Sequence, residues 1–323
     1  MAERELVEQL DQAIESLLAG TGAAVSSGSE LALLTEVARG LCDLPSEDFK
    51  KQLKTELQRR AFMTATSTAS GVRDAGYRTI TPLLIHRNAP GLVEFLKATF
   101  GAEELKRNTM GEAFYSEVRL GDSMIAIAGG SAAEYGNLPS ALHVYVDDCD
   151  AAYRRAIDAG AVTLMGATGE PADRPYGERS AFVKDAFGNY WYIATRLGST
   201  PPAEHLGTVL PYAHPARARA YIDFLKRAFG AQEMAVYEHA GRVMHAVVRV
   251  GDAVLELGEP EDRTGIPSNG SFVFVDDVEA AYERALAAGA TSVRTPEDTQ
   301  YGMRSAIVRD PEGYLWWPAR WNG

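Results

Sequence analysis

Few residues in this chain have the types and spacing that chemistry on a small molecule requires. The candidates are His143, His245 and Glu256, which can exchange protons or bind a charged group. No carboxylate lies at a sequence spacing that would orient His143 as a base. Cys42 and Cys149 stand far apart and form neither a redox pair nor a metal-ligand spacing. The sequence also lacks the signatures of a phosphate loop and of a hydrolase nucleophile elbow.

The elements that must position these residues come in two copies. The segment FLKATFGAEE at 95–104 returns as FLKRAFGAQE at 224–233. In the same way, VDDCDAAYRRAIDAGA at 146–161 returns as VDDVEAAYERALAAGA at 275–290. A period of about 129 residues is too long for a solenoid unit, so the pattern indicates a duplicated domain.

Length, composition and charge restrict the class of protein. The 323 residues are 46% hydrophobic and 24% charged, which is typical of a soluble chain with more than one domain. A net charge of −12 disfavours nucleic-acid binding and mildly favours cationic small molecules. The first residues, MAERELVEQL, lack a secretion signal, and no stretch is long enough to span a bilayer. We therefore expect a cytoplasmic protein with no membrane or nucleic-acid partner.

Residues 1–75 differ in pattern from the rest of the chain. Leu6, Leu10, Ile14 and Leu17 recur at helical spacing, and the polar run TATSTASG is typical of a linker. We predict a small α-helical segment and linker here. The segment either packs on the body or on a second copy of the chain as a homodimer, or it docks a partner protein.

From residue 76 onward a pattern of one strand, one helix and three further strands occurs twice in each repeat. Such a unit forms a curled sheet with one helix on its convex side, and two units side by side form a half-barrel cup. We predict an α+β fold with a first domain at 76–198 and a second at 204–323. Each domain is expected to hold two paired βαβββ units.

This arrangement, with FLK..FGA, VDD...A and YG.RSA.V.D..G in both repeats, resembles the vicinal oxygen chelate superfamily over residues 78–321. That superfamily includes glyoxalase I, extradiol dioxygenases, fosfomycin-modifying enzymes and bleomycin-binding proteins. The chain is most similar to its phosphonate-operon-protein-like branch. The resemblance implies two tandem glyoxalase-like domains, but fold alone does not give function.

Enzymes of this superfamily hold a divalent metal with one His, Gln or Glu side chain from each of four strands. Aligned on the shared motifs, the eight positions are Thr81, Ala126, Ala141 and Tyr192 in the first repeat and Leu210, Glu256, Gly270 and Trp317 in the second. One carboxylate cannot supply the three or four ligands that a catalytic metal needs, and a shift of two residues adds only His143. We expect no metal and no cofactor.

Aromatic side chains replace the metal ligands. Since alternate residues of a strand share a face, the first cup is expected to carry Thr81, Leu83, His143, Tyr145, Tyr190 and Tyr192. The second is expected to carry Tyr212, Glu256, Phe272, Phe274 and Trp317, while the facing of His245 stays open. These side chains either line a ligand pocket or fill the cups as ordinary core.

The charge of Glu256 guides the choice between the cups. A buried carboxylate is costly unless it is paired, so Glu256 either binds a cationic ligand or pairs with an internal arginine. An aromatic box with one carboxylate favours a cation, which predicts that the second cup binds a cationic aromatic molecule. Arg179 and Arg304 recur in YG.RSA of both repeats, which favours a structural role for them.

Three functions remain open. The first is a metal-free binding protein of the glyoxalase and bleomycin-resistance type, which sequesters an aromatic or cationic natural product, as in antibiotic self-resistance. The second is a metal-independent isomerase, lyase or cyclase, in which His143, Tyr192, Glu256 or His245 transfers protons. The third is a protein-interaction scaffold that docks through residues 1–75.

Overall fold

The computed structural model of the chain describes residues 76–130, 136–197, 207–262, 265–299 and 302–322. Both repeats lie in one compact unit. The helical segment and linker predicted at 1–75 lie outside the described residues. Within the described ranges, no helix has the length and apolar character needed to cross a membrane.

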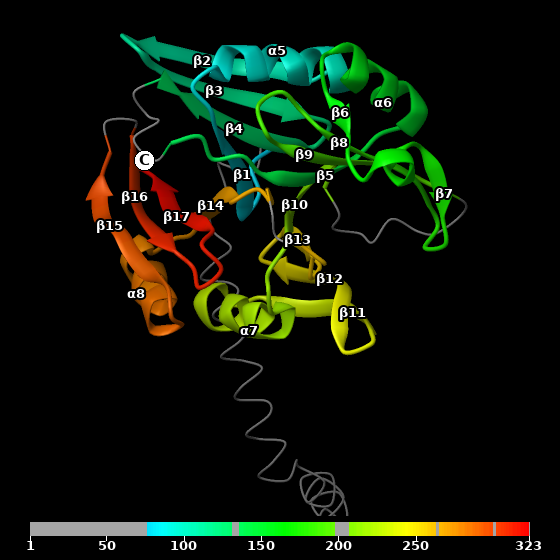
Figure 1. The fold of residues 1–323 in the computed structure, drawn as a ribbon. Helices are drawn as coiled ribbons and strands as arrows, with labels where there is room; N and C mark the ends of the chain where they lie inside the picture. Colours follow the sequence, from blue (N-terminus) through cyan, green and yellow to red (C-terminus); the bar gives the residue numbers. More distant parts are fainter. Residues whose placement is uncertain (1–75, 131–135, 198–206, 263–264, 300–301, 323) are drawn as a thin grey trace, which may run out of the picture. The chain divides into compact units, whose positions relative to one another are not determined.

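Four units of one strand, one helix and further strands follow one another along the chain (Figure 1). Unit 1 comprises β1 (Ile80–Ile85), α5 (Ala89–Phe100), β2 (Glu103–Met110), β3 (Ala113–Leu120) and β4 (Ser123–Gly129). Unit 2 comprises β5 (Ala141–Tyr145), α6 (Cys149–Asp158), β6 (Val162–Thr163), the 3-10 turn η2 (Gly166–Gly169), β7 (Ala172–Arg174), β8 (Glu178–Lys184) and β9 (Tyr190–Arg196).

The second repeat supplies the other two units. Unit 3 comprises β10 (Val209–Ala213), α7 (Ala218–Phe229), β11 (Gln232–His239), β12 (Arg242–Val250) and β13 (Ala253–Leu257). Unit 4 comprises β14 (Gly270–Phe274), α8 (Val278–Ala287), β15 (Thr291–Asp298), β16 (Met303–Arg309) and β17 (Leu315–Trp321). The α+β class is therefore confirmed, and so is the predicted pattern in units 1, 3 and 4, whereas unit 2 has four further strands in place of three.

Local sequence signals set the helix ends. Asp148 and Asp277 precede α6 and α8, and each side chain accepts a hydrogen bond from the backbone N–H three residues later. Gly101 and Gly230 follow α5 and α7 with φ of 69° and 68°, a left-handed conformation that glycine adopts without the strain of a side chain. Because these signals recur in the repeats, α6 and α8 begin alike, and α5 and α7 end alike.

The units pair across the repeats. The sheet named here sheet 1 has the strand order β15-β16-β17-β14-β1-β4-β3-β2 and so joins units 1 and 4. Sheet 2 has the order β11-β12-β13-β10-β5-β9-β8-β6 and joins units 2 and 3, with β7 paired to β8. Antiparallel pairing of β1 with β14 and of β5 with β10 closes the two seams. The prediction that each repeat folds into its own cup was therefore wrong.

The physical reason is that the first strand of each unit has one edge that is not paired within its own unit, and the local sequence does not determine which other first strand pairs there. β1, β5, β10 and β14 are all short and buried, so their local patterns do not specify a partner. On the helix-covered faces of the sheets, however, the two units of each repeat pack against each other. α5 and α6 share one apolar cluster of the first repeat, and α7 and α8 share another of the second (Figure 1). Each repeat thus contributes one unit to each sheet.

Two repeated motifs have structural roles. Asp185 and Asp310 each begin a D-x-x-G turn and accept a hydrogen bond from the indole N–H six residues on, at 2.9 and 2.8 Å. Burial raises the pKa of Asp310 to about 6. Arg179 links β8 to Asp150 in the first turn of α6, and Arg304 links β16 to the first turn of α8. The structural role predicted for both arginines is therefore confirmed.

Candidate functional site

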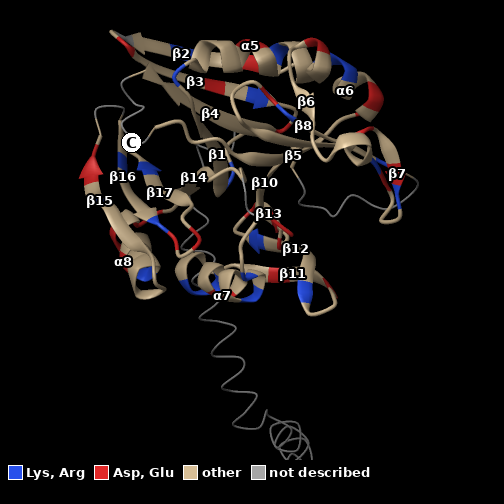
Figure 2. Ribbon diagram, in the orientation of Figure 1, with Lys and Arg blue, Asp and Glu red and all other residues tan. Residues whose placement is uncertain are grey.

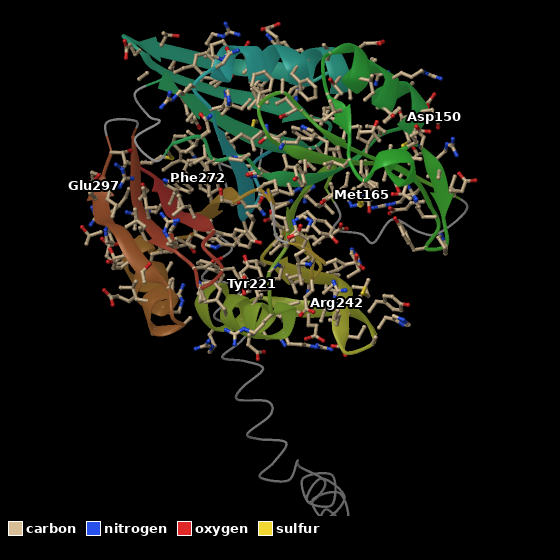
Figure 3. All side chains as sticks on the ribbon, viewed as in Figure 1. Asp150, Met165, Tyr221, Arg242, Phe272 and Glu297 are labelled. Carbon is tan, nitrogen blue, oxygen red and sulfur yellow. The ribbon has the colours of Figure 1, made fainter. Side chains whose placement is uncertain are left out.

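The helix-free face of sheet 1 is mostly a packed apolar interior, although it also carries Tyr115 and the 9% exposed Glu117, which pairs with Lys106 at 3.3 Å. Leu83, Phe272, Phe274 and Trp317 belong to one buried cluster there, and each is at most 5% exposed. Phe272 and Trp317 lie 6.3 Å apart between ring centroids, and Figure 3 places Phe272 among the crowded side chains of this region. Thr81 is also buried and donates its hydroxyl proton to the Arg78 carbonyl. These five predicted ligand-binding residues fill sheet 1 as core.

The helix-free face of sheet 2 carries more titratable side chains, and among them are histidines, which the strands of sheet 1 lack. His143 on β5 and Glu256 on β13 are 8% and 3% exposed, and His143 Nδ1 lies 2.7 Å from Glu256 Oε2. The carboxylate that orients His143 comes from the other repeat, 113 residues away, which is why no sequence spacing revealed it. Glu256 therefore has a histidine partner, where the sequence suggested an arginine or a ligand.

Mutual interaction shifts the pKa of both groups. Burial alone would raise the pKa of Glu256, but the charge and hydrogen bond of His143, together with those of His245, hold the pKa of this carboxyl well below its usual value. Burial alone would lower the pKa of His143, but the charge and hydrogen bond of Glu256 and the charge of Glu178 raise it. The pair is thus stabilised as a carboxylate and an imidazolium.

Further side chains extend this pair in both directions. His245 Nε2 lies 3.6 Å from Glu256 Oε2, and His143 Nε2 lies 3.8 Å from Glu178 Oε2. The Tyr145 hydroxyl donates to Glu178 Oε1 at 2.9 Å. Tyr145, Glu178, His143, Glu256 and His245 form what we name the acid–base row, which runs from β8 to β12 across sheet 2. Its two ends differ, because the His245 side chain is 44% exposed while Glu178 is 15% exposed.

Aromatic rings surround the row without being sealed into the core. Tyr192 and Tyr212 pack edge to face with ring centroids 4.8 Å apart, and the Tyr192 hydroxyl lies 2.7 Å from His214 Nε2. Tyr145 stacks on His143 at 4.5 Å. Tyr145, Tyr190, Tyr192 and Tyr212 are all half-buried. Five half-open rings, counting His245, leave apolar surface that a flat molecule can cover.

A cleft of about 380 Å³ opens at the Tyr145 end of the row. It is lined by Asp122, Tyr145, Val146, Asp147, Thr195, Arg196, Gly207 and Thr208. The guanidinium of Arg196 lies over the Tyr145 ring, 4.1 Å from its centroid. The cleft therefore reaches the row through Tyr145 and Arg196.

The donor set does not fit the metal that the family resemblance implies. In sheet 1 the four positions hold Thr81, Ala126, Gly270 and Trp317, which offer no carboxylate or imidazole. In sheet 2 they hold Ala141, Tyr192, Leu210 and Glu256, and the neighbouring His143 already uses Nδ1 to bind Glu256. In the part of the chain that the structure describes, no three His, Cys, Asp or Glu side chains are placed to hold a metal ion.

Sequence reasoning missed Glu178, Arg196 and His214. A signal was present, because these positions differ between otherwise similar repeats. Glu178 stands in YGERSA where the second repeat has Met303 in YGMRSA. The comparison of repeats drew attention to what they share, whereas the residues that differ carry the polar chemistry of sheet 2.

Comparisons with known proteins agree with the fold. Residues 215–317 match the family model described as the Glyoxalase/Bleomycin resistance protein/Dioxygenase superfamily. An uncharacterised protein of Mycobacterium bovis is 34% identical over 112 residues, which are 31% of this chain and 73% of that protein. CFP32 of the same organism, whose name proposes a glyoxylase, is 25% identical over 212 residues, 64% of this chain and 79% of that protein. The crystal structure of glyoxalase I from Zea mays superimposes with a TM-score of 0.56 at 15% identity, over 74% of this chain and 92% of that chain.

Proposed function

The chain belongs to the Glyoxalase/Bleomycin resistance protein/Dioxygenase superfamily, and from this premise we propose that it binds a small aromatic molecule on the helix-free face of sheet 2 without a metal ion. The observation that carries the proposal is the contrast in packing between the two sheets. In sheet 1, Phe272, Phe274 and Trp317 are buried while Tyr115 and Trp321 are half-buried, whereas the four tyrosines around the acid–base row of sheet 2 are all half-buried.

Stacking on these tyrosines supports useful affinity. Each aromatic contact contributes about 0.5–1.5 kcal/mol beyond the burial of area. A ligand of roughly 30 heavy atoms at about 0.3 kcal/mol per atom reaches about −9 kcal/mol, a sub-micromolar dissociation constant, without any covalent chemistry. Sequestration of a toxic aromatic natural product is the physiological role that such binding would serve.

The ligand need not be cationic. The preference for a cation depended on Glu256 standing beside Phe272, Phe274 and Trp317, but those three rings lie on sheet 1. The Glu256 carboxylate itself lies 2.7 Å from one histidine and 3.6 Å from another. Since two imidazoles already surround this charge, a ligand cation adds little to its stabilisation.

Isothermal titration with two aromatic probes, 2-naphthol and 2-naphthylmethylammonium, tests the proposal on the full chain. We expect both probes to bind with similar affinity, and Tyr212→Ala to weaken binding about tenfold or more. The matched control is Tyr115→Ala, which removes a tyrosine of sheet 1 and leaves sheet 2 intact. Loss of binding in Tyr115→Ala with none in Tyr212→Ala would move the site to sheet 1 and refute the proposal.

The natural ligand requires a separate measurement. Native mass spectrometry of protein purified from its own host would detect a bound small molecule by its added mass. We expect the added mass to disappear in Tyr212→Ala and to persist in Tyr115→Ala.

A further inference from the structure

Binding alone does not require the acid–base row of sheet 2. A buried carboxylate and a buried imidazole each cost free energy unless they are paired, and sheet 1 forms the same fold with a buried carboxylate, Glu117, but no histidine in its strands. At the places that His143 and Glu256 occupy in sheet 2, sheet 1 has Phe272 and Ala126. The row is therefore a local addition to the fold.

Of the two histidines in the row, His245 is the one that a ligand can reach. Its side chain is 44% exposed, and its Nε2 lies 3.6 Å from Glu256 Oε2. His143 is 8% exposed, and its Nε2 is fully buried without a hydrogen-bond partner among the described residues. Glu256 thus stands between an accessible imidazole and a buried one.

The order His143, Glu256, His245 is suited to proton transfer. A carboxylate beside an imidazole orients the ring and stabilises the imidazolium that forms when the ring accepts a proton. His143 binds the same carboxylate oxygen at 2.7 Å and so fixes the position of Glu256. His143 and Glu256 are positioning residues here, because neither presents an exposed reacting atom.

An aromatic hydroxyl lies on the same face. The Tyr212 ring is 6.3 Å from the His245 ring and 4.8 Å from the Tyr192 ring, between centroids. The Tyr192 hydroxyl is 2.7 Å from His214 Nε2. A ligand on Tyr212 would therefore have a histidine on one side and a hydroxyl on the other.

Resting on the proposed binding site, we propose that sheet 2 is a metal-independent proton-transfer centre with His245 as its catalytic residue. The substrate class is a small aromatic or conjugated carbon acid, in which a C–H bond is next to a carbonyl group. The His245 imidazole takes the proton, the C–H electron pair forms the C=C bond of an enolate, and the carbonyl π pair moves to oxygen. The Tyr192 hydroxyl donates its proton in a hydrogen bond to that oxygen while it accepts a hydrogen bond from His214 Nε2–H.

The second half of the reaction restores the enzyme. The His245 imidazolium returns the proton to a different carbon of the conjugated system, and the enolate electron pair forms the new C–H bond as the carbonyl is regenerated. No atom is gained or lost, so the net reaction is an isomerisation that needs no oxidant or co-reactant.

The test uses 5-nitrobenzisoxazole, a flat aromatic carbon acid, with the full chain. A base removes its ring C–H proton, the electron pair forms a nitrile as the N–O bond breaks, and a coloured phenolate is released. We expect turnover above the buffer rate, and in His245→Gln a kcat about 100-fold lower with a much smaller change in the dissociation constant of the probe. The matched control is His239→Gln, an exposed histidine at the end of β11, which should keep full activity.

Chemical rescue separates a catalytic role from a structural one. In His245→Gly the missing ring leaves a gap at a half-exposed position, so added imidazole should restore turnover in proportion to its concentration. Glu256→Gln should lower kcat with little change in the dissociation constant, because it removes the group that orients His245.

The outcomes distinguish this inference from the proposed binding function. Binding of the probe without turnover would overturn the inference and leave the binding proposal standing. Turnover that survives in His245→Gln would also overturn it. Failure of the probe to bind at all would overturn both.

Discussion

Sheets 1 and 2 have the same strand order and matching registers, yet they differ in the side chains at several matching positions of their helix-free faces. In sheet 2, His143 is in register with Tyr192, and in sheet 1 the matching pair is Phe272 and Trp317. Tyr212 is in register with Glu256, where sheet 1 has Leu83 and Ala126. Glu178 is in register with Arg196, where sheet 1 has Met303 and Trp321. At each of these positions, polar or titratable groups in one sheet are matched by apolar groups in the other.

The difference indicates that one sheet of a duplicated fold can stabilise the chain while the other offers a surface for binding. The apolar face of sheet 1 adds buried area, which stabilises the chain at about 25 cal/mol per Å². On the helix-free face of sheet 2 less apolar area is buried, and charges and hydroxyls that a ligand can contact take its place. Charged residues elsewhere show no such division, since Lys and Arg are interspersed with Asp and Glu along α5 and α6 (Figure 2).

The largest expected effect is on the buried ion pair. Glu256→Ala leaves His143 buried without its carboxylate and should lower the free energy of unfolding by about 3–5 kcal/mol. The double variant His143→Phe, Glu256→Ala gives sheet 2 the residues of sheet 1 and should recover most of this loss. Urea denaturation measures both. A double variant as unstable as the single one would show that the two interiors are not interchangeable.

The second effect compares two rings at matching register. Trp317→Ala removes a 5% exposed indole from a packed cluster and should cost about 3 kcal/mol or more. Tyr192→Ala removes a half-buried ring and should cost about 2 kcal/mol less than that. Denaturant midpoints at constant slope test the difference. Equal losses would mean that sheet 2 is packed as tightly as sheet 1.

The third effect is the pH window in which the His143–Glu256 pair of sheet 2 stabilises the protein. The folded-state pKa of Glu256 is below the usual 4.5, so its stabilisation is present above that value and is lost as the pH falls through the folded pKa. The folded-state pKa of His143 is above the usual 6.5, so its stabilisation is present below 6.5 and is lost as the pH rises through the folded pKa. The pair should therefore stabilise the protein most between 4.5 and 6.5.

The measurement is the difference in unfolding free energy between the wild type and the double variant His143→Phe, Glu256→Ala, followed from about pH 4 to about pH 9. We expect the difference to become smaller on the alkaline side of the window, because His143 loses its proton there. A difference that is constant over this range would contradict the proposed charge states.

The smallest expected effect is that of metal removal. Because neither sheet offers three suitable ligands among the described residues, a chelator should leave the melting temperature unchanged. Elemental analysis of the purified protein should show no stoichiometric zinc, nickel, manganese or iron. One tightly held metal ion would contradict the fit of the donor set.

The candidate site was only partly predictable from the sequence. His143, Tyr145, Tyr190, Tyr192, Tyr212, His245 and Glu256 were identified as site candidates, and all lie in sheet 2. Their grouping was wrong, because the sequence assigned His143 to one cup and Glu256 to another. Phe272, Phe274 and Trp317 were equally plausible from alternation alone, since a strand pattern gives the face of a residue but not what packs on it.

The sequence by itself determined the local structure of this protein. Helix caps such as Asp148 and Asp277, glycines such as Gly101, and the alternation of strands act over a few residues, and their repetition made the four units predictable. Only the tertiary structure decided which units share a sheet. The pairing of β5 with β10 is what brings His143 to Glu256 over a separation of 113 residues. Strand pairing is a long-range choice made by packing, so the acid–base row exists only in the folded chain.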